Sequence, residues 1–297
     1  MTLREIYANN KDKSNPVISF EIFPPKNDED GTKLDKLIYH MSILKKYNPA
    51  FISLTYGAGG TNQNFALDII KRIKNELNVT VMPHFTCVGA SSESVKAYLK
   101  EIQSLGLKSI LALRGDIPDG MTQSSFDFKY ANELVEFIKA HTQLSVGVAG
   151  YPEGHLECSD LKTDLDNLKR KVDAGADAIY TQMFFDNEKF LDFVNKAKNA
   201  GINVPIIPGI LPIMSFPQFE RMLSMARVSV PAALMQNLEK FKDNNDDAKA
   251  VGVEFATQQC QQLIAEGIEG LHFYTLNTSA SVSKILDNLK IGQNVLM

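Results

Sequence analysis

The sequence of 297 residues lacks the features that mark several common classes of protein. It has no tract of Lys and Arg with interleaved aromatic residues, and its net charge is −4, so we expect no nucleic-acid partner. No apolar run reaches the roughly 20 residues that a membrane span needs. The first twenty residues contain no apolar segment of a secretory signal. We therefore expect a soluble, cytoplasmic protein.

Cysteine is also scarce. The three cysteines, Cys87, Cys158 and Cys260, lie far apart and have no CxxC spacing. This pattern is typical of reduced thiols in the cytoplasm and indicates neither a disulfide framework nor a zinc site. His84 and His155 are two of only five histidines and show no local ligand spacing, so we expect no metal.

Three motifs of cofactor binding or catalysis are missing. No G-x-G-x-x-G follows a β-rich run, and the nearest candidate, Gly57-Ala58-Gly59-Gly60, has the wrong spacing. The G-x-S-x-G elbow of serine hydrolases does not occur. The predicted strands contain no lysine of the kind that a Schiff-base aldolase needs. These absences favour redox or group-transfer chemistry on a bound cofactor, without specifying which.

What the sequence does contain is one unit repeated, because short apolar, β-rich runs alternate with longer segments of helical periodicity. The predicted strands are 17–23, 51–56, 79–86, 109–114, 144–150, 178–185, 204–210 and 271–276. Near-continuous apolar strands indicate a parallel sheet covered on both faces, and eight such units are typical of a closed barrel of about 250 residues. We predict an α/β fold, a single (β/α)8 TIM barrel over residues 1–297, with an open doubly wound sheet as the alternative.

Several helices can be placed between these strands. The segment 159–174 has an apolar stripe at helical spacing, with Ser159 as its expected N-cap and Gly175 as its stop. The segment 91–105 repeats this pattern. The long gap before the last strand leaves room for extra helices, which we place at 216–227, 231–240 and 246–266.

Chemistry in such barrels takes place at the C-terminal ends of the strands. Nearly every predicted strand ends in polar side chains, which are Glu21, Thr55, Tyr56, His84, Thr86, Arg114, Asp116, Tyr151, Glu153, His155, Gln182, Asp186 and Asn277. The strand 204–210 offers only backbone and apolar surface there. We therefore expect a ring of polar residues at one end of the barrel to form the active site.

Glu21 is the main catalytic candidate of this ring, because it lies inside an apolar strand. We expect burial to raise its pKa toward the range of a general acid, although a structural carboxylate at the barrel mouth is the alternative. Arg114-Gly115-Asp116 places opposite charges around a glycine, which suits a polar ligand; a simple Arg–Asp pair is the alternative.

A polar stripe on the predicted helix 159–174 borders its apolar stripe and contains Asp164, Asn167, Arg170 and Lys171. A solvated helix face is one interpretation. The other is that the first turns of this helix point at a sugar or phosphate near the top of the barrel.

Nine segments, in order and at compatible spacings, resemble the methylenetetrahydrofolate reductases. They are SFEIFPP (19–25), TYGA (55–58), PHFTC (83–87), ALRGD (112–116), AGYPE (149–153), NLKRKVDAGA (167–176), TQMFFD (181–186), IIPGILP (206–212) and HFYTLN (272–277). The resemblance implies a (β/α)8 barrel that binds FAD without a Rossmann fingerprint. It also implies NAD(P)H-dependent reduction of 5,10-methylenetetrahydrofolate to 5-methyltetrahydrofolate, a ping-pong reaction of one-carbon metabolism that supplies methionine synthesis.

The resemblance further implies site residues. Flavin contacts would come from Thr55, His84, Arg114, Gly115, Asp116, Tyr151, His155, Asp164, Asn167, Arg170 and Lys171. The folate or nicotinamide side would be formed by Glu21, Asp116, Gln182 and Phe216. In these roles Glu21 donates the proton that opens the imidazolidine ring, and Asp116 stabilises the resulting iminium charge. Gln182 bonds either substrate, and Phe216 stacks on an aromatic ring.

One position departs from the family pattern, because Thr278 stands where an arginine usually follows FYTLN. Affinity for the folate glutamate tail is therefore in doubt. Without the large C-terminal regulatory region of eukaryotic relatives, the chain resembles the short bacterial form, and a homo-oligomer is expected. Two alternatives stay open: a pterin-binding barrel that transfers a one-carbon group without flavin, and a folate-binding or partner-binding barrel without catalysis.

Overall fold

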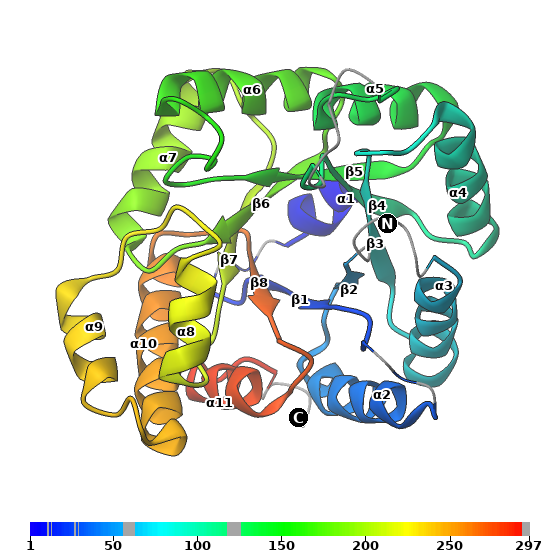
Figure 1. Ribbon diagram of the computed structural model, residues 1–297. Coiled ribbons are helices and arrows are strands. Elements are labelled where there is room, and N and C mark those ends of the chain that lie inside the picture. The colour runs from blue at the N-terminus through cyan, green and yellow to red at the C-terminus, as the bar shows by residue number, and fades with distance from the viewer. Residues whose placement is uncertain are drawn as a thin grey trace.

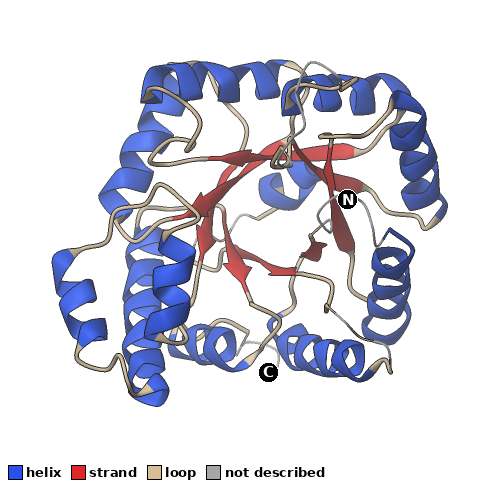
Figure 2. Ribbon diagram, in the orientation of Figure 1, coloured by secondary structure: helices blue, strands red, loops and turns tan. Residues whose placement is uncertain are grey.

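The computed structural model describes residues 1–10, 12, 14–26, 28, 30–55, 63–117 and 126–292. Eight parallel strands close into one barrel in sequence order (Figures 1 and 2). They are β1 (Val17–Ile22), β2 (Phe51–Leu54), β3 (Val81–Thr86), β4 (Ser109–Leu113), β5 (Ser145–Gly150), β6 (Ala178–Met183), β7 (Ile206–Ile210) and β8 (Gly270–Tyr274). The last strand pairs with the first, from Val17↔Gly270 to Glu21↔Tyr274. The predicted (β/α)8 barrel is confirmed, and the open doubly wound sheet is excluded.

Helices surround this barrel (Figure 2). They are α2 (Thr32–Leu44), α3 (Gln63–Arg72), α4 (Ser92–Ser104), α5 (Ala131–His141), α6 (Leu161–Asp173), α7 (Asn187–Asn199), α8 (Phe216–Leu223), α9 (Ala232–Glu239), α10 (Asn245–Ala265) and α11 (Ala280–Asn288). The predicted extra helices before the last strand are confirmed as α8, α9 and α10. Among the described residues, no helix is long and apolar enough to cross a bilayer.

The start of α6 corrects one expectation. Ser159 is not the N-cap; Asp160 is, and its carboxylate accepts hydrogen bonds from the Thr163 N–H and hydroxyl, both at 2.8 Å. Ser159 instead donates its hydroxyl to Asp160 Oδ2 at 2.9 Å. A carboxylate can accept both bonds at once and favours the positive end of the helix, so it takes the cap position. The predicted stop at Gly175 is confirmed, with a φ of +113°.

A short helix that the sequence analysis did not predict closes the N-terminal end of the barrel. This helix, α1 (Leu3–Ala8), begins with a capping box and lies inside the ring of outer helices (Figure 1). The Leu3 N–H donates to Ser145 Oγ at 3.0 Å, at the start of β5, and the hydroxyls of Tyr7 and Tyr180 lie 3.1 Å apart. The strand-end residues therefore lie at the opposite end of the barrel from α1.

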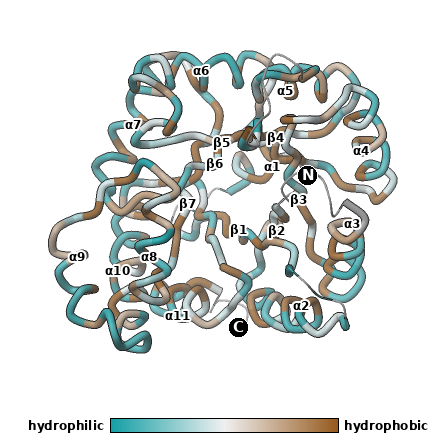
Figure 3. Tube along the Cα trace, viewed as in Figure 1, coloured by the Kyte–Doolittle hydropathy of each residue, from teal (hydrophilic) through white to brown (hydrophobic). Residues whose placement is uncertain are grey.

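Apolar residues gather on the strands and the inner faces of the helices (Figure 3). Successive strand residues point to opposite faces, and in β1 Phe20 and Ile22 join the cluster between barrel and helices. Ser19 and Glu21 therefore point into the barrel. The polar residues of β1 thus line the inside of the barrel, while its apolar residues pack in the core between barrel and helices.

Candidate active site

Glu21 lies between two histidines near the open end of the barrel. Its Oε2 is 3.5 Å from His84 Nε2, on β3, and 3.6 Å from His272 Nε2, on β8. The Glu21 side chain is 19% exposed, whereas both histidines are buried. One carboxylate oxygen therefore faces two imidazoles from different strands, in a place that a ligand can still reach.

The expectation of a raised pKa for Glu21 is wrong for this arrangement. Burial is the largest single influence and raises the pKa, but the contact with His272 and the electrostatic interactions with His84 and His272 together lower it overall. Burial also lowers the pKa of His84 to about 4. At neutral pH Glu21 is therefore ionised and His84 is neutral.

Arg114 follows β4 and is held in one orientation by two partners. Its Nη1 and Nη2 donate to Glu157 Oε2 and Oε1 at 2.5 and 2.6 Å, and its Nε donates to the carbonyl of Gly115 at 3.0 Å. Gly115 has a φ of +85°, and an added Cβ would lie 2.9 Å from Thr86 Cβ. The ion-pair partner of Arg114 is thus Glu157, from the loop after β5, while Asp116 remains exposed.

The loop after β5 and helix α6 form a polar wall beside Arg114. The rings of Tyr151 and His155 meet edge to face at 4.6 Å. Lys171 Nζ donates to the Ala149 carbonyl at 2.6 Å and lies 5.7 Å from the Tyr151 ring. Burial lowers the pKa of Lys171 to about 8 and raises the pKa of Asp164, which the positive charge of Lys171 opposes.

The helical polar stripe is therefore only partly a solvated face. Lys171 and Asp164 are half-buried within the wall. Arg170 is exposed, and its Nη1 donates to Asn167 Oδ1 at 3.1 Å. Along one edge of the barrel end, α6 thus presents the cations of Arg170 and Lys171 and the amide of Asn167.

The remaining predicted residues lie at other strand ends. Thr55 directly follows β2, and its N–H donates to the carbonyl of Ile22 at 2.9 Å. Gln182, near the end of β6, accepts the Met183 N–H at 3.0 Å through its own Oε1. Phe216 is the first residue of α8 and is half-buried. Tyr56 and the segment Gly57-Ala58-Gly59-Gly60 lie outside the described residues.

This arrangement can be compared with known proteins. Residues 6–290 match the family model described as methylenetetrahydrofolate reductase. The chain belongs to this family. It is 39% identical over 260 residues to the 5,10-methylenetetrahydrofolate reductase of Escherichia coli (strain K12), covering 88% of this chain and 86% of that relative.

Other relatives of the family are longer. The chain is 42% identical over 287 residues to methylenetetrahydrofolate reductase (NADH) 1 of Arabidopsis thaliana, covering 92% of this chain and 48% of that relative. It thus spans about half the length of the plant and yeast relatives that it matches. A solved structure of an uncharacterized Clostridium thermocellum protein, described as binding two copies of 5-methyl-5,6,7,8-tetrahydrofolic acid, superposes with a TM-score of 0.67. It is 15% identical and covers 97% of both chains, which supports the fold.

One neighbour of Glu21 in this methylenetetrahydrofolate reductase family member, His272, was not among the site residues predicted from the sequence. Its Nδ1 lies 2.7 Å from Ser19 Oγ, so the imidazole is fixed with Nε2 toward Glu21. The feature that places His272 in the site is the register of β1 and β8, in which Ser19 pairs with His272. Glu157 was also missed, because nothing in its local sequence shows that its partner follows another strand.

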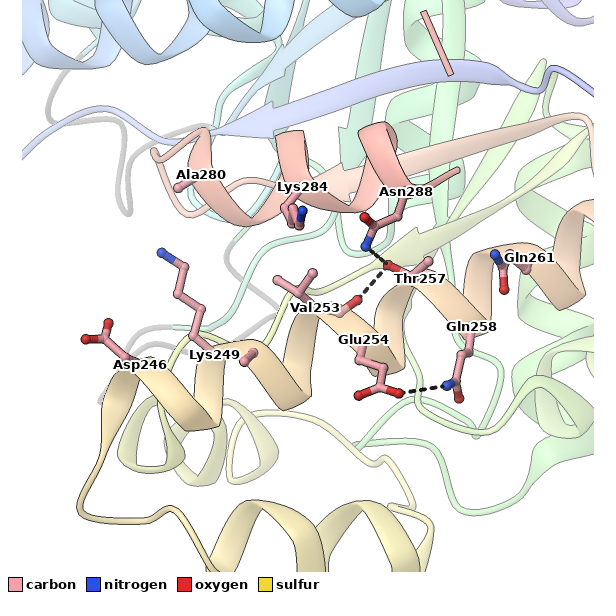
Figure 4. Close-up of a pocket in the computed structure, with 11 residues that line it drawn as sticks. Asp246, Lys249, Val253, Glu254, Thr257, Gln258, Gln261, Ala280, Lys284 and Asn288 are labelled. Carbon is pink, nitrogen blue, oxygen red and sulfur yellow. Dashed lines mark hydrogen bonds between the residues drawn. The ribbon is translucent and has the colours of Figure 1, made fainter. Parts of the chain in front are cut away.

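In the part of the chain that the structure describes, no group of three or more His, Cys, Asp or Glu side chains is arranged to hold a metal ion. A groove of about 660 Å³ lies between α10 and α11, with Lys249, Glu254 and Lys284 among its lining (Figure 4). It is formed by two outer helices and contains none of the strand-end residues, so the candidate active site is the barrel end.

Proposed function

We propose that this protein reduces 5,10-methylenetetrahydrofolate to 5-methyltetrahydrofolate, with FAD as bound cofactor and NADH or NADPH as electron donor. The observation that carries the proposal is Glu21, held between His84 and His272 at the same barrel end as the wall from Arg114 to Lys171. The family and the name of the Escherichia coli relative support the folate substrate. The reaction belongs to one-carbon metabolism and supplies methionine synthesis.

The polar wall fits a flavin dinucleotide. Arg114, Arg170 and Lys171 provide the cations that a diphosphate requires. Gly115, whose φ of +85° suits glycine, packs against Thr86 between Arg114 and Asp116. His84 Nε2 is buried and makes no hydrogen bond to any described residue, so a ligand atom can satisfy it. The proposed contacts are Thr55, His84, Arg114, Gly115, Asp116, Tyr151, His155, Asp164, Asn167, Arg170 and Lys171. FAD held by these residues would supply hydride transfer from NAD(P)H to the folate, with the two substrates using the site in turn.

Glu21 acts as the proton donor in this proposal. The imidazolidine ring of the folate must open to an iminium cation before it accepts hydride, and ring opening needs a proton. A pterin seated over Glu21 excludes water and so raises the carboxyl pKa, which lets Glu21 gain the proton that it then donates. His272, fixed by Ser19, holds the carboxylate in place. Asp116, exposed beside the wall, stabilises the iminium charge.

Gln182 and Phe216 serve both substrates in the same proposal. The amide of Gln182 can donate or accept a hydrogen bond, which suits either a pterin or a nicotinamide carboxamide. Phe216 offers a ring for stacking. Thr278, whose hydroxyl donates to the Thr275 carbonyl at 3.3 Å, brings no charge to the folate tail. We further propose one catalytic domain over residues 1–297, a cytoplasmic location and a homo-oligomer.

The flavin and the proton donor can be tested on the purified protein. We expect a yellow protein, with absorption bands near roughly 380 and 450 nm for bound oxidised flavin. Anaerobic NADH bleaches the colour and methylenetetrahydrofolate restores it; parallel titrations with NADPH identify the preferred donor. Protein that stays colourless after incubation with FAD contradicts the proposal and favours one-carbon transfer without flavin.

Glu21→Gln separates the two halves of the reaction. The variant keeps bleaching by NADH, because hydride transfer to the flavin needs no proton from Glu21, but loses the recovery by at least about 100-fold. Glu254→Gln, in the groove between α10 and α11, is the matched control and keeps both rates. Recovery at the parental rate in Glu21→Gln rules out the proton-donor role.

A further inference from the structure

Phe23 is an aromatic residue directly beyond β1, and its ring is not part of the core. The side chain is 41% exposed. Among the described residues, it belongs to none of the three clusters of packed apolar side chains. Leaving an aromatic ring in water forgoes the free energy that its burial would contribute. The fold therefore does not explain why an aromatic residue stands here.

The backbone of Phe23 is nevertheless held firmly by Asn277, beyond the end of β8. The Phe23 N–H donates to Asn277 Oδ1 at 3.0 Å, and Asn277 Nδ2 donates to the Phe23 carbonyl at 2.7 Å. These two bonds continue the pairing of β1 with β8 beyond its last pair, Glu21↔Tyr274. One side chain thus fixes both polar groups of the Phe23 peptide backbone.

Asn277 reaches this position through an uncommon backbone conformation. Both Leu276 and Asn277 have positive φ, at +51° and +59°. Leucine rarely adopts the left-handed region, and such conformations persist only where surrounding contacts enforce them. Thr275 supplies those contacts, because its Oγ1 donates to the Glu21 carbonyl at 2.7 Å and accepts the Asn277 N–H at 3.2 Å.

The same geometry places the Phe23 ring on the side of Glu21. Side chains alternate along an extended chain, and Ile22 between them is fully buried in the core cluster. Glu21 and Phe23 therefore share the face that looks toward the open end of the barrel. A rigid, exposed ring next to the catalytic carboxylate has the properties of a stacking surface.

We propose that Phe23 is a binding residue that stacks on a planar heteroaromatic ring of the substrate, and that Asn277 is the positioning residue that holds it. The pterin of the folate and the nicotinamide share this ring chemistry. The inference rests on the proposed function. It adds a contact that the polar groups of the site do not provide, because a ring face recognises a ligand by shape and polarisability.

Calorimetric titration of the flavin-loaded protein tests the stacking. The two probes are 5-methyltetrahydrofolate, titrated anaerobically into protein with reduced flavin, and NAD⁺, titrated into protein with oxidised flavin. Neither pair can exchange a hydride, so both probes bind without turnover. Phe23→Leu keeps the apolar volume and removes the ring, so the Kd for at least one probe rises about three- to tenfold. Phe23→Tyr retains parental affinity. The probe that is weakened identifies which ring Phe23 meets, and an unchanged Kd for both probes overturns the proposal.

Two controls keep this result interpretable. Tyr39→Leu removes another exposed aromatic ring, 63% exposed on α2, and leaves both Kd values unchanged. Thermal unfolding of Phe23→Leu matches the parent, since the ring packs in no cluster. Parental protein that binds neither probe contradicts the proposed function itself, whereas binding that ignores Phe23→Leu contradicts only the stacking.

Asn277→Gly tests the positioning role without straining the chain, because glycine adopts positive φ freely. The substitution removes both bonds to Phe23, and the Kd for the same probe rises about two- to fivefold. In the Phe23→Leu background the same change has little further effect, because the ring it positions is gone. A full effect of Asn277→Gly in both backgrounds overturns the positioning role.

Discussion

Lys171 is a residue whose charge depends on pH because of burial. Its ammonium group donates to the Ala149 carbonyl and lies against Tyr151, on the half-buried edge of α6. Burial lowers its pKa to about 8, which is close to the pH at which enzymes are assayed. Arginine at the same position would stay charged throughout that range.

A pH dependence of cofactor binding follows. Lys171 is cationic below about pH 8 and loses its charge above it. Affinity for the proposed cofactor FAD, whose diphosphate is negative, should therefore be retained below pH 8 and fall as the pH rises to 9.5. Lys171→Arg should flatten this decline, whereas Lys196→Arg on α7 should not. Flavin fluorescence titrations measure the profile, and an equally steep decline in Lys171→Arg would contradict the assignment.

His84 predicts a pH dependence of stability. Its pKa is lowered to about 4 in the folded protein, so the unfolded chain binds its proton first as the pH falls from about 6.5 to 4. Folding therefore becomes less favourable over that range, by up to about 3 kcal/mol. His84→Gln carries no such proton, so its Tm should fall less between pH 6.5 and 4. If the Tm of both proteins falls equally between pH 6.5 and 4, protonation of His84 does not cause this loss of stability.

At the scale of the elements, apolar patterning predicted the strands and outer helices from the sequence, because each buried face repeats with a fixed period. Contacts between distant elements were not predictable in this way. The lowered pKa of Glu21 needs histidines from β3 and β8, and the Arg114–Glu157 pair joins two separate loops. Local sequence gives no measure of such distances.

Gly252, inside α10, marks a contact of this kind. An added Cβ would lie 2.3 Å from the carbonyl oxygen of Ile213 and 2.7 Å from its Cβ. Gly252→Ala improves helix propensity by about 1 kcal/mol, but the added methyl group would clash with the backbone of Ile213, which cannot move without a larger cost. We therefore expect the free energy of unfolding to fall by about 2 kcal/mol in total. Thermal and urea unfolding measure it, with Lys249→Ala on the same helix as control. A stabilised Gly252→Ala would show that α10 and the loop after β7 can move apart.

The whole molecule separates stability and chemistry between the two ends of the barrel. Helix α1 fills the N-terminal end, where Asp177 joins Arg4 at 2.8 Å, Lys139 at 3.1 Å and the Val146 N–H at 2.9 Å. The candidate active site occupies the other end. A substitution at the N-terminal end of the barrel should therefore alter the free energy of unfolding without altering ligand affinity.

Tyr7 provides that test. Tyr7→Ala removes a fully buried ring from the N-terminal end of the barrel and should lower the free energy of unfolding by about 3–5 kcal/mol. Tyr7→Phe loses only the hydroxyl contact with Tyr180 and should cost about 1 kcal/mol. Both variants should bind FAD with parental affinity at temperatures where they are folded. Weakened FAD binding by Tyr7→Phe would show that the two ends are coupled.

The pairing of β1 with β8 also determines when the barrel can close during synthesis. The ribosome adds about 5–20 residues per second, and β8, the last partner of β1, emerges only after the other seven strands. Until then the nascent chain carries a strand with one open edge, and Glu21 has no imidazole from β8 beside it. Pairing of the final strand thus shields that edge from other chains and brings the last of these side chains into place, so a product interrupted before β8 has neither a closed barrel nor a complete site.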